Sequence, residues 1–209
     1  DIALGTAKLF GIELLKNFAF PYFSRDIAEF WRRWHISLST WFRDYLYIPL
    51  GGSKGGMSMK IRNTLIIFLV SGFWHGANWT FIIWGLLNAI YIMPSIIFNT
   101  HRNNLDIVAK GKVFPTIKEF LSMLLTFGLT VFAWIFFRAD NVGDAITYIA
   151  GILSPSLFSL PQIPITILGI CTVVLLVFFV ITEWFGREKD YALAAIGNKW
   201  PTLLRLIFY

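Results

Sequence analysis

Two histidines stand out among the residues able to carry chemistry. His75 lies within a 39-residue run, 63–101, that contains no Asp, Glu, Lys or Arg. An ionisable side chain within so apolar a stretch is costly to place, so it indicates a function by default. A neutral, buried imidazole can accept a proton from an alcohol, as a general base must. The alternative is a histidine that hydrogen-bonds across helices and only holds them together.

His35 and its neighbours form a second set of candidates. His35 lies at the edge of an apolar helical face, where it is either a second polar group in the cavity of His75 or an interfacial residue of an amphipathic helix. Arg32, Arg33 and Arg43 have the geometry to pair with the phosphates of an acyl carrier or coenzyme. Anionic lipid headgroups are an equally good match for these arginines.

Asn78 follows His75 by about one helical turn. Its amide could orient a substrate carbonyl, or it could cap the helix that follows. Other chemistry has little support: the chain has no Cys/His or Asp/Glu cluster with metal-ligand spacing, and no serine in a GxSxG elbow. The glycine-rich stretch 51–56 lacks the order of a phosphate-binding loop, which predicts a flexible turn.

The elements that must position these residues are membrane helices. One crossing needs about 20 residues, so the run 63–101 is about twice too long for one straight helix. Its middle holds Gly72, Gly76, His75 and Asn78, which predicts two helical pieces, 61–73 and 78–98, with a break between them. Irregular backbone at membrane depth requires surrounding protein or a wet cavity, so the break implies a larger bundle.

Composition supports a membrane protein. The chain is 56% hydrophobic and only 14% charged, with a mean hydropathy of +0.65, whereas soluble domains are about 25% charged. These values exclude a disordered chain and a disulfide-stapled module. The net charge of +6 comes from basic residues beside Trp and Phe at the ends of apolar runs, as at membrane interfaces, and does not indicate nucleic acid.

The segment 24–60 is expected to lie at the cytoplasmic interface. Residues 21–62 carry seven basic and three acidic side chains, which places them inside by the positive-inside rule. Apolar residues recur at helical spacing from Ile27 to Tyr45, so we predict one amphipathic helix, capped by Ser24, followed by the glycine-rich loop.

The predicted architecture is an all-α polytopic membrane helix bundle with a broken or re-entrant helix pair and interfacial amphipathic helices. The whole chain, 1–209, is interpreted as one membrane-embedded domain. Besides the segments above, its predicted parts are a partly buried helix at 1–23, membrane helices at 114–137 and 163–183, and the start of a last helix at 200–209.

Two sequence strings go beyond composition. FWRRWHISLSTWFRDYLYIPLGG at 30–52 and SGFWHGANW at 71–79 together closely resemble the membrane-bound O-acyltransferase (MBOAT) family. The similarity is greatest to its alginate O-acetyltransferase-like branch. Members are longer multi-helix membrane enzymes, so the resemblance implies that this chain is the C-terminal part of one, without the N-terminal half and the end of the final helix.

The resemblance also assigns roles to residues. The histidine of the WHG string is the catalytic residue of the family, which here is His75, and the histidine of the RRWH string is its second important histidine, here His35. Residues of the two strings expected to bind substrate or support the site are Asn78, Trp74, Arg32, Arg33, Trp34, Ser37, Arg43 and Asp44. No metal and no bound cofactor are expected.

The implied activity is transfer of an acetyl group from a cytoplasmic thioester, acetyl-CoA or an acyl carrier, for O-acetylation of an exported polysaccharide such as alginate or peptidoglycan. The implied setting is the bacterial inner membrane, with membrane lipid, the polysaccharide acceptor and an esterase-like periplasmic acetyltransferase as partners. Two alternatives remain open. One is D-alanyl or other acyl transfer by the same fold, and the other is a non-enzymatic transporter or export subunit, because transporters also break helices at mid-membrane.

Overall fold

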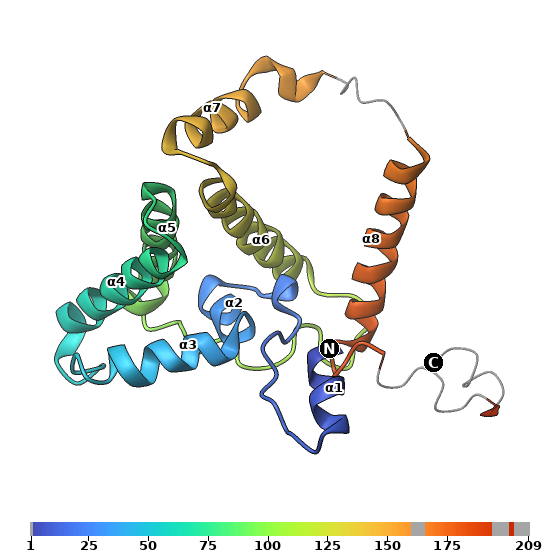
Figure 1. Cartoon of the computed structure of the whole chain (residues 1–209), viewed down its shortest axis with the longest axis horizontal. Helices are drawn as coiled ribbons and strands as arrows, with labels where there is room; N and C mark the ends of the chain where they lie inside the picture. The colour runs from blue at the N-terminus through green and yellow to red at the C-terminus, as the bar shows by residue number, and fades with distance from the viewer. Residues whose placement is uncertain (1, 160–165, 194–200, 203–209) are drawn as a thin grey trace. The chain divides into compact units, whose positions relative to one another are not determined.

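The structure is a computed structural model that describes residues 2–159, 166–193, 201 and 202. Its regular elements are all helical (Figure 1), which confirms the predicted all-α class. They are α1 (Ile2–Leu9), η1 (Pro21–Phe23), α2 (Ile27–Arg33), α3 (Ile36–Phe42), η2 (Arg43–Tyr47), α4 (Gly56–His75), α5 (Trp79–Ile97), α6 (Ile117–Arg138), α7 (Val142–Ile152), η3 (Pro155–Phe158) and α8 (Ile167–Gly186).

The chain divides into two compact units. The larger comprises Asp1–Val108 and Pro115–Leu160, and the smaller comprises Ala109–Phe114 and Pro161–Tyr209. In the smaller unit, Arg187 holds the short segment against the end of α8 by donating hydrogen bonds to the carbonyl oxygens of Ala109 and Lys112. The larger unit contains all the histidines and both motif strings, so it contains the candidate site.

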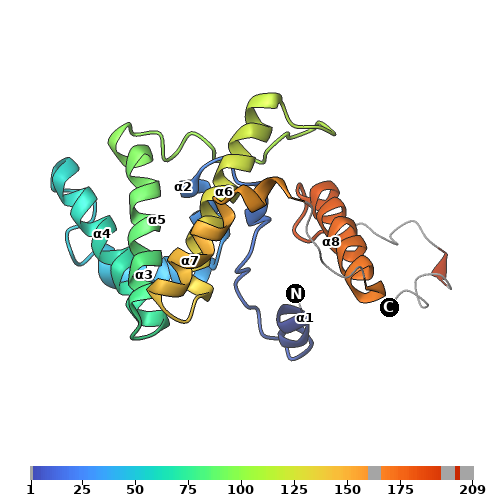
Figure 2. The same cartoon turned by 90° about the horizontal axis from the view of Figure 1, so that it is seen from above.

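Helices α4 and α5 form a close antiparallel hairpin in the larger unit (Figures 1 and 2). Two glycines allow the close approach: a Cβ atom on Gly72 would collide with the carbonyl oxygen of Phe81, and one on Gly85 would collide with that of Phe68. Small residues at a helix crossing let backbones pack tightly inside membranes. The hairpin therefore carries His75 on a rigid support.

The break between α4 and α5 falls at Gly76–Asn78. Gly76 has φ 153° and ψ 160°, a conformation open almost only to glycine. The sequence predicts helical pieces at 61–73 and 78–98. In the structure α4 begins earlier, at Gly56, because its first turn starts directly at the end of the glycine-rich stretch 51–56. The side chain of Asn63 secures that loop by donating hydrogen bonds to the carbonyl oxygens of Leu50 and Gly52.

The amphipathic segment differs from its prediction. Instead of one helix, the chain forms α2 and α3, separated at Trp34 and His35, and a π-helical turn, η2, follows. His35 has φ 46° and ψ 55°, which is the left-handed region and interrupts a right-handed helix. Asp26, and not Ser24, caps α2, since its carboxylate accepts a hydrogen bond from the N–H of Glu29.

The opening segment also differs from its prediction. A partly buried helix is expected over 1–23, but α1 is only eight residues long and has no buried residue. Residues 12–18 are not helical, because Gly11, at φ 73°, ends the helix and the following residues bond to α2 and α3 instead.

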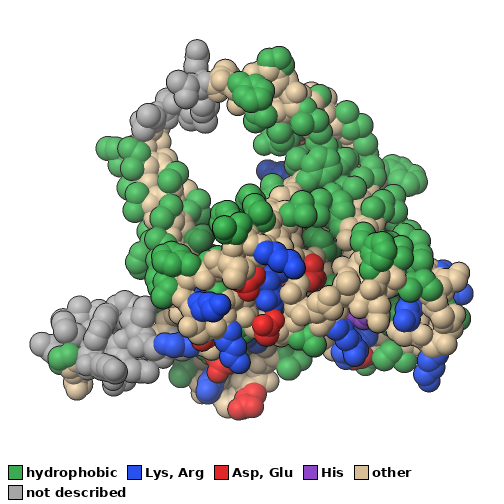
Figure 3. Space-filling model, turned by 180° about the vertical axis from the view of Figure 1, so that it is seen from behind, with side chains coloured by type: hydrophobic (Ala, Val, Ile, Leu, Met, Phe, Trp, Pro, Cys, Tyr) green, Lys and Arg blue, Asp and Glu red, His purple; other side chains and the backbone are tan. Residues whose placement is uncertain are grey.

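Three helices in the described residues are long and apolar enough to cross a membrane: α5, α6 and α8. Helices α6 and α8 occupy the positions predicted at 114–137 and 163–183, while most of the segment 200–209 lies outside the described residues. Figure 3 shows hydrophobic side chains over the helices of the larger unit and charged side chains gathered at one end. This separation is typical of a protein embedded in lipid and flanked by a charged interface.

Candidate active site

His75 is the last residue of α4 and is half-buried. Aromatic rings from α5 and α6 enclose its imidazole: the ring centroids of Trp84 and Phe137 lie 5.2 and 4.9 Å away, both nearly perpendicular to it. Trp74, beside it on α4, is 5.0 Å away and exposed. Within the described residues, no side chain hydrogen-bonds to the imidazole, so both of its nitrogens are available to a substrate.

Both polar atoms of the Asn78 side-chain amide form hydrogen bonds to the backbone. Its Oδ1 accepts a hydrogen bond from the N–H of Thr80, which caps α5, and its Nδ2 donates to the carbonyl oxygen of Asp140. Of the two roles open from the sequence, the geometry matches the cap. Asn78 thus anchors the start of α5, next to the loop that joins α6 and α7.

His35 occupies the junction between α2 and α3. Its Nδ1 is buried and has no hydrogen-bond partner in the described part of the chain. The ring of Phe18 lies 6.0 Å from the imidazole. The preceding Trp34 stacks on Phe30 at 5.5 Å and 17°. A buried imidazole nitrogen without a partner is uncommon in a protein interior and marks a place where a ligand group can bond.

One cluster of aromatic rings connects the surroundings of the two histidines. Trp84, which contacts His75, lies 5.9 Å from Trp31 of α2, and Trp31 lies 5.7 Å from Phe30. Phe30 in turn stacks on Trp34, the residue before His35. Trp84 belongs to the hydrophobic core that also includes Ala133, Phe136 and Ala145, and Trp31 packs against this core. The fold therefore brings the two sequence motifs onto one packed support.

A cleft of about 770 Å³ lies beside this cluster, between α2, α3, α4 and the loop after α5. On α4 its wall includes Thr64, Phe68 and Ser71, which recur at helical spacing on the face that reaches His75 one turn later. None of the described residues that line the cleft is acidic. Its basic members are Arg32, Arg43, Lys60, His101 and Arg102.

Two of the arginines expected to bind phosphate are bonded to the protein instead. Arg32 donates to the carbonyl oxygens of His101 and Asn104, at 2.7 Å each, and so fixes the loop after α5. Burial lowers the pKa of the Arg32 guanidinium, which nevertheless stays charged because an arginine side chain is not deprotonated in proteins. Arg33 donates to both the carboxylate of Glu29 and the carbonyl oxygen of Ala19.

Arg43 is exposed and bonds to its neighbour Asp44. A hydrogen bond from Arg43 lowers the pKa of the Asp44 carboxyl below its usual value. Both side chains face solvent, so the pair contributes little to stability and can exchange for another anion. Lys60 and Arg102 have no ion-pair partner among the described residues. The cleft therefore offers positive charge mainly through residues that the sequence motifs do not contain.

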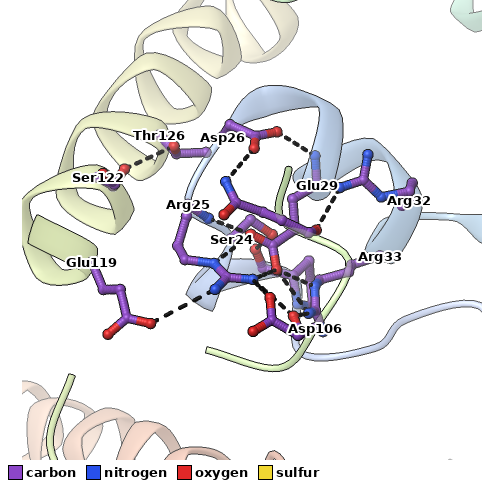
Figure 4. Close-up of polar contacts among 12 residues, drawn as sticks. Ser24, Arg25, Asp26, Glu29, Arg32, Arg33, Asp106, Glu119, Ser122 and Thr126 are labelled. Carbon is purple, nitrogen blue, oxygen red and sulfur yellow. Dashed lines mark hydrogen bonds and ion pairs between the residues drawn. The ribbon is translucent and has the colours of Figure 1, made fainter. Parts of the chain in front are cut away.

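A buried charge cluster surrounds Glu29, and it was not among the sequence-based predictions (Figure 4). The Glu29 side chain is 1% exposed and pairs with Arg25 at 3.1 Å and Arg33 at 2.8 Å. Arg25 also pairs with Asp106, at 2.9 Å. Burial opposes charge on Arg25, but its bonds to the two carboxylates outweigh burial and raise the pKa of its guanidinium. The spacing of Arg25, Glu29 and Arg33 at four residues was a readable signal of this cluster.

The fold and the site define a helical membrane protein with a histidine at a helix break. Residues 1–137 match the membrane-bound O-acyltransferase (MBOAT) family, and both His35 and His75 lie in the matched range. The chain therefore belongs to this family, as the motif strings predict.

Three curated relatives illustrate its range. A peptidoglycan O-acetyltransferase from Helicobacter pylori is 43% identical over 73% of this chain and 28% of its own length. A protein named probable alginate O-acetylase AlgI from Azotobacter vinelandii is 40% identical over 94% and 38%. A teichoic acid D-alanyltransferase from Streptococcus thermophilus is 42% identical over 42% and 23%. The chain thus spans less than two-fifths of the length of each of these proteins.

Proposed function

We propose that this chain forms the catalytic part of an O-acyltransferase that moves an acetyl group from a cytoplasmic thioester across the membrane, for O-acetylation of an exported polysaccharide. The observation that carries the proposal is His75, held at a helix break, enclosed by aromatic rings and free of hydrogen bonds in the described residues. Similarity to O-acetyltransferases of alginate and peptidoglycan supports the choice of an acetyl group and a cell-surface glycan.

In the proposed reaction, His75 acts as the general base. Its imidazole takes the proton from the acceptor hydroxyl while the hydroxyl oxygen attacks the thioester carbonyl. The carbon–sulfur bond then breaks, and the leaving thiolate takes the proton back from His75, which gives an ester and a free thiol. His35 contributes a hydrogen bond to the carbonyl oxygen as negative charge develops on it. The rings of Trp84 and Phe137 cover part of the His75 imidazole and so limit its contact with water, which would otherwise hydrolyse the thioester.

The donor is proposed to enter from the cytoplasmic side through the 770 Å³ cleft. Lys60 and Arg102, together with the exposed Arg43, meet its phosphate groups, and the face of α4 that carries Ser71 guides the acyl arm toward His75. An acceptor hydroxyl is proposed to approach His75 from the other side of the membrane. An esterase-like periplasmic transferase would then pass the acetyl group from this first acceptor to the polysaccharide in the bacterial cell envelope.

The test uses the full-length protein in inner-membrane vesicles with a radiolabelled acetyl donor. His75→Ala is expected to lower acetyl transfer by about 10²- to 10⁴-fold, the range that general-base catalysis supplies. Phe73→Leu, an exposed position two residues earlier on α4, is the matched control and is expected to keep full activity. Transfer that survives His75→Ala at wild-type rate in a correctly inserted protein contradicts the proposal.

The donor cleft has its own test. Lys60→Ala is expected to raise the KM for the donor by about tenfold with little change in kcat, because it removes binding that ground state and transition state share. Lys54→Ala removes the same charge from the exposed glycine-rich loop, outside the cleft, and is expected to leave the KM unchanged. Equal effects of the two variants would mean that general surface charge, and not the cleft, attracts the donor.

The same vesicle assay distinguishes acetyl transfer from two other activities, D-alanyl transfer and transport. Similarity to teichoic acid D-alanyltransferases over 42% of the chain favours D-alanine as a second candidate acyl group. Labelled D-alanyl donor in place of acetyl donor distinguishes the two. A transporter would instead move substrate across the vesicle membrane without any acyl donor and without need of a base at His75.

A further inference from the structure

Residues 17–19 lie along the junction between α2 and α3 and bond to it on both sides of His35. Before the junction, the N–H of Ala19 donates to the carbonyl oxygen of Arg33 at 2.9 Å. After it, the N–H of Ile36 donates to the carbonyl oxygen of Asn17 at 3.0 Å. The guanidinium of Arg33 adds a bond to the carbonyl oxygen of Ala19. Residues 17–19, which are not helical, therefore stabilise the junction at which the chain changes direction between α2 and α3.

The start of α3 needs a cap that His35 does not provide. His35 stands at the capping position, but its side chain makes no capping hydrogen bond. Asn17, twenty residues before Ser37, supplies one. Its Oδ1 accepts hydrogen bonds from the N–H of Ser37 at 3.0 Å and from the hydroxyl of Ser37 at 2.6 Å. The unpaired N–H groups of a helix's first turn are normally satisfied by the capping residue itself.

Because Asn17 caps α3, the imidazole of His35 is not used as a cap. The residue adopts the left-handed conformation, at φ 46°, which is sterically costly for a histidine and persists only when surrounding bonds impose it. Its Nδ1 is buried without a partner in the described residues. Had His35 capped α3 in the usual way, its backbone would be extended and its side chain would turn back toward the first turn of that helix.

We propose that Asn17 is a positioning residue for His35. Its amide oxygen caps α3 in place of the His35 side chain, and so holds the His35 backbone in the left-handed conformation with an imidazole nitrogen free for the reaction. The inference rests on the proposed function, in which His35 takes part in acyl transfer. Ser37, which the motif string places beside His35, serves the same arrangement as the donor to Asn17.

The test compares Asn17→Ala with Asn17→Asp in the full-length protein. Asn17→Ala removes the acceptor oxygen and is expected to lower kcat by about 10- to 100-fold with the KM for the donor unchanged, because Asn17 does not line the donor cleft. The carboxylate of Asn17→Asp can accept both hydrogen bonds of Ser37, so this variant is expected to restore kcat to within about threefold. Asn103→Ala, at an exposed asparagine outside the junction, is the matched control.

A double-mutant cycle with His35 separates positioning from general support of the fold. If Asn17 acts through His35, Asn17→Ala is expected to lower kcat by less than about twofold in a protein that already carries His35→Ala. If Asn17→Ala lowers kcat by the same factor in the wild-type and the His35→Ala backgrounds, the proposal is overturned. Should Asn17→Ala fail to accumulate in the membrane, Ser37→Ala removes only the hydroxyl donor, and its smaller loss must likewise vanish in the His35→Ala background or the proposal falls.

Different results contradict the proposed role of His35 and the inference about Asn17. Wild-type kcat in His35→Ala alone contradicts the role of His35 in the proposed function, and with it the reason for positioning His35. A large loss in His35→Ala together with full activity in Asn17→Ala overturns only the inference about Asn17.

Discussion

Replacement of His35 by glycine and by alanine tests the break between α2 and α3 directly. Both substitutions delete the imidazole, so the difference between them reports only the backbone. At φ 46° and ψ 55° an alanine carries the steric cost of the left-handed region, about 1–2 kcal/mol, and glycine does not. Glycine loses about 0.5 kcal/mol of this advantage because its unfolded chain is more flexible. His35→Gly is therefore expected to be more stable than His35→Ala by about 1 kcal/mol.

A straight helix through the same residue predicts the opposite sign. In a helix interior, alanine is more stable than glycine by about 1 kcal/mol. A break at His35 and a continuous helix therefore predict stability differences between His35→Gly and His35→Ala that lie about 2 kcal/mol apart. This corresponds to roughly a 30-fold ratio of unfolding equilibrium constants.

The assay is unfolding of the purified full-length protein in detergent, with each pair of variants titrated side by side. Thr40, inside α3, provides the control pair: there alanine is expected to be the more stable replacement. If His35→Ala proves more stable than His35→Gly by the same margin as at Thr40, α2 and α3 form one continuous helix and the reasoning about the junction is refuted.

Three further predictions concern the supports of the site. Gly76→Ala is expected to lower acyl transfer and to destabilise the hairpin by about 1–3 kcal/mol, because φ 153° suits glycine and a Cβ would lie 2.8 Å from the ring of Phe81; an unchanged unfolding midpoint would contradict this. Glu29→Gln is expected to destabilise the fold by about 3–5 kcal/mol, since it removes the acidic partner of Arg33 and leaves Arg25 with only the more exposed Asp106 and Glu119. Denaturant titration against the exposed-site variant Glu13→Gln measures the difference. Asp44→Asn is expected to leave stability at pH 7 nearly unchanged, because the ion pair is exposed. The lowered pKa of Asp44 makes the small contribution of the pair present above the usual carboxyl value and lost as the pH falls through the lowered one, so unfolding curves at pH 7 and pH 3 check its sign.

The sequence alone was sufficient to locate the histidine at the helix break. His75 and Asn78 are visible because a membrane helix cannot extend through so long an uncharged run, and because a Gly and an Asn mark the end of one helix and the start of the next. The family could also be identified from residues 30–52 and 71–79, which the match over residues 1–137 confirms. These features are local, and local features can be read from the order of residues.

Tertiary structure decided what the residues around His35 do. Apolar spacing continues across Trp34 and His35 as if one helix ran through them, since a single left-handed residue changes the direction of the chain without changing its periodic pattern. Bonds from Asn17 and Ala19 impose that conformation, and a partner so far away in the sequence leaves no local signal.

The roles of the arginines depended on tertiary structure for the same reason. Arg32 and Arg33 resemble phosphate ligands by type and position, yet the loop after α5 and the buried Glu29 engage them. Lys60 and Arg102 line the cleft instead, although neither belongs to a recognisable motif. The sequence determined which chemical groups the protein has and where its helices break, whereas only the packing of distant segments decided which of those groups remain free to meet a substrate.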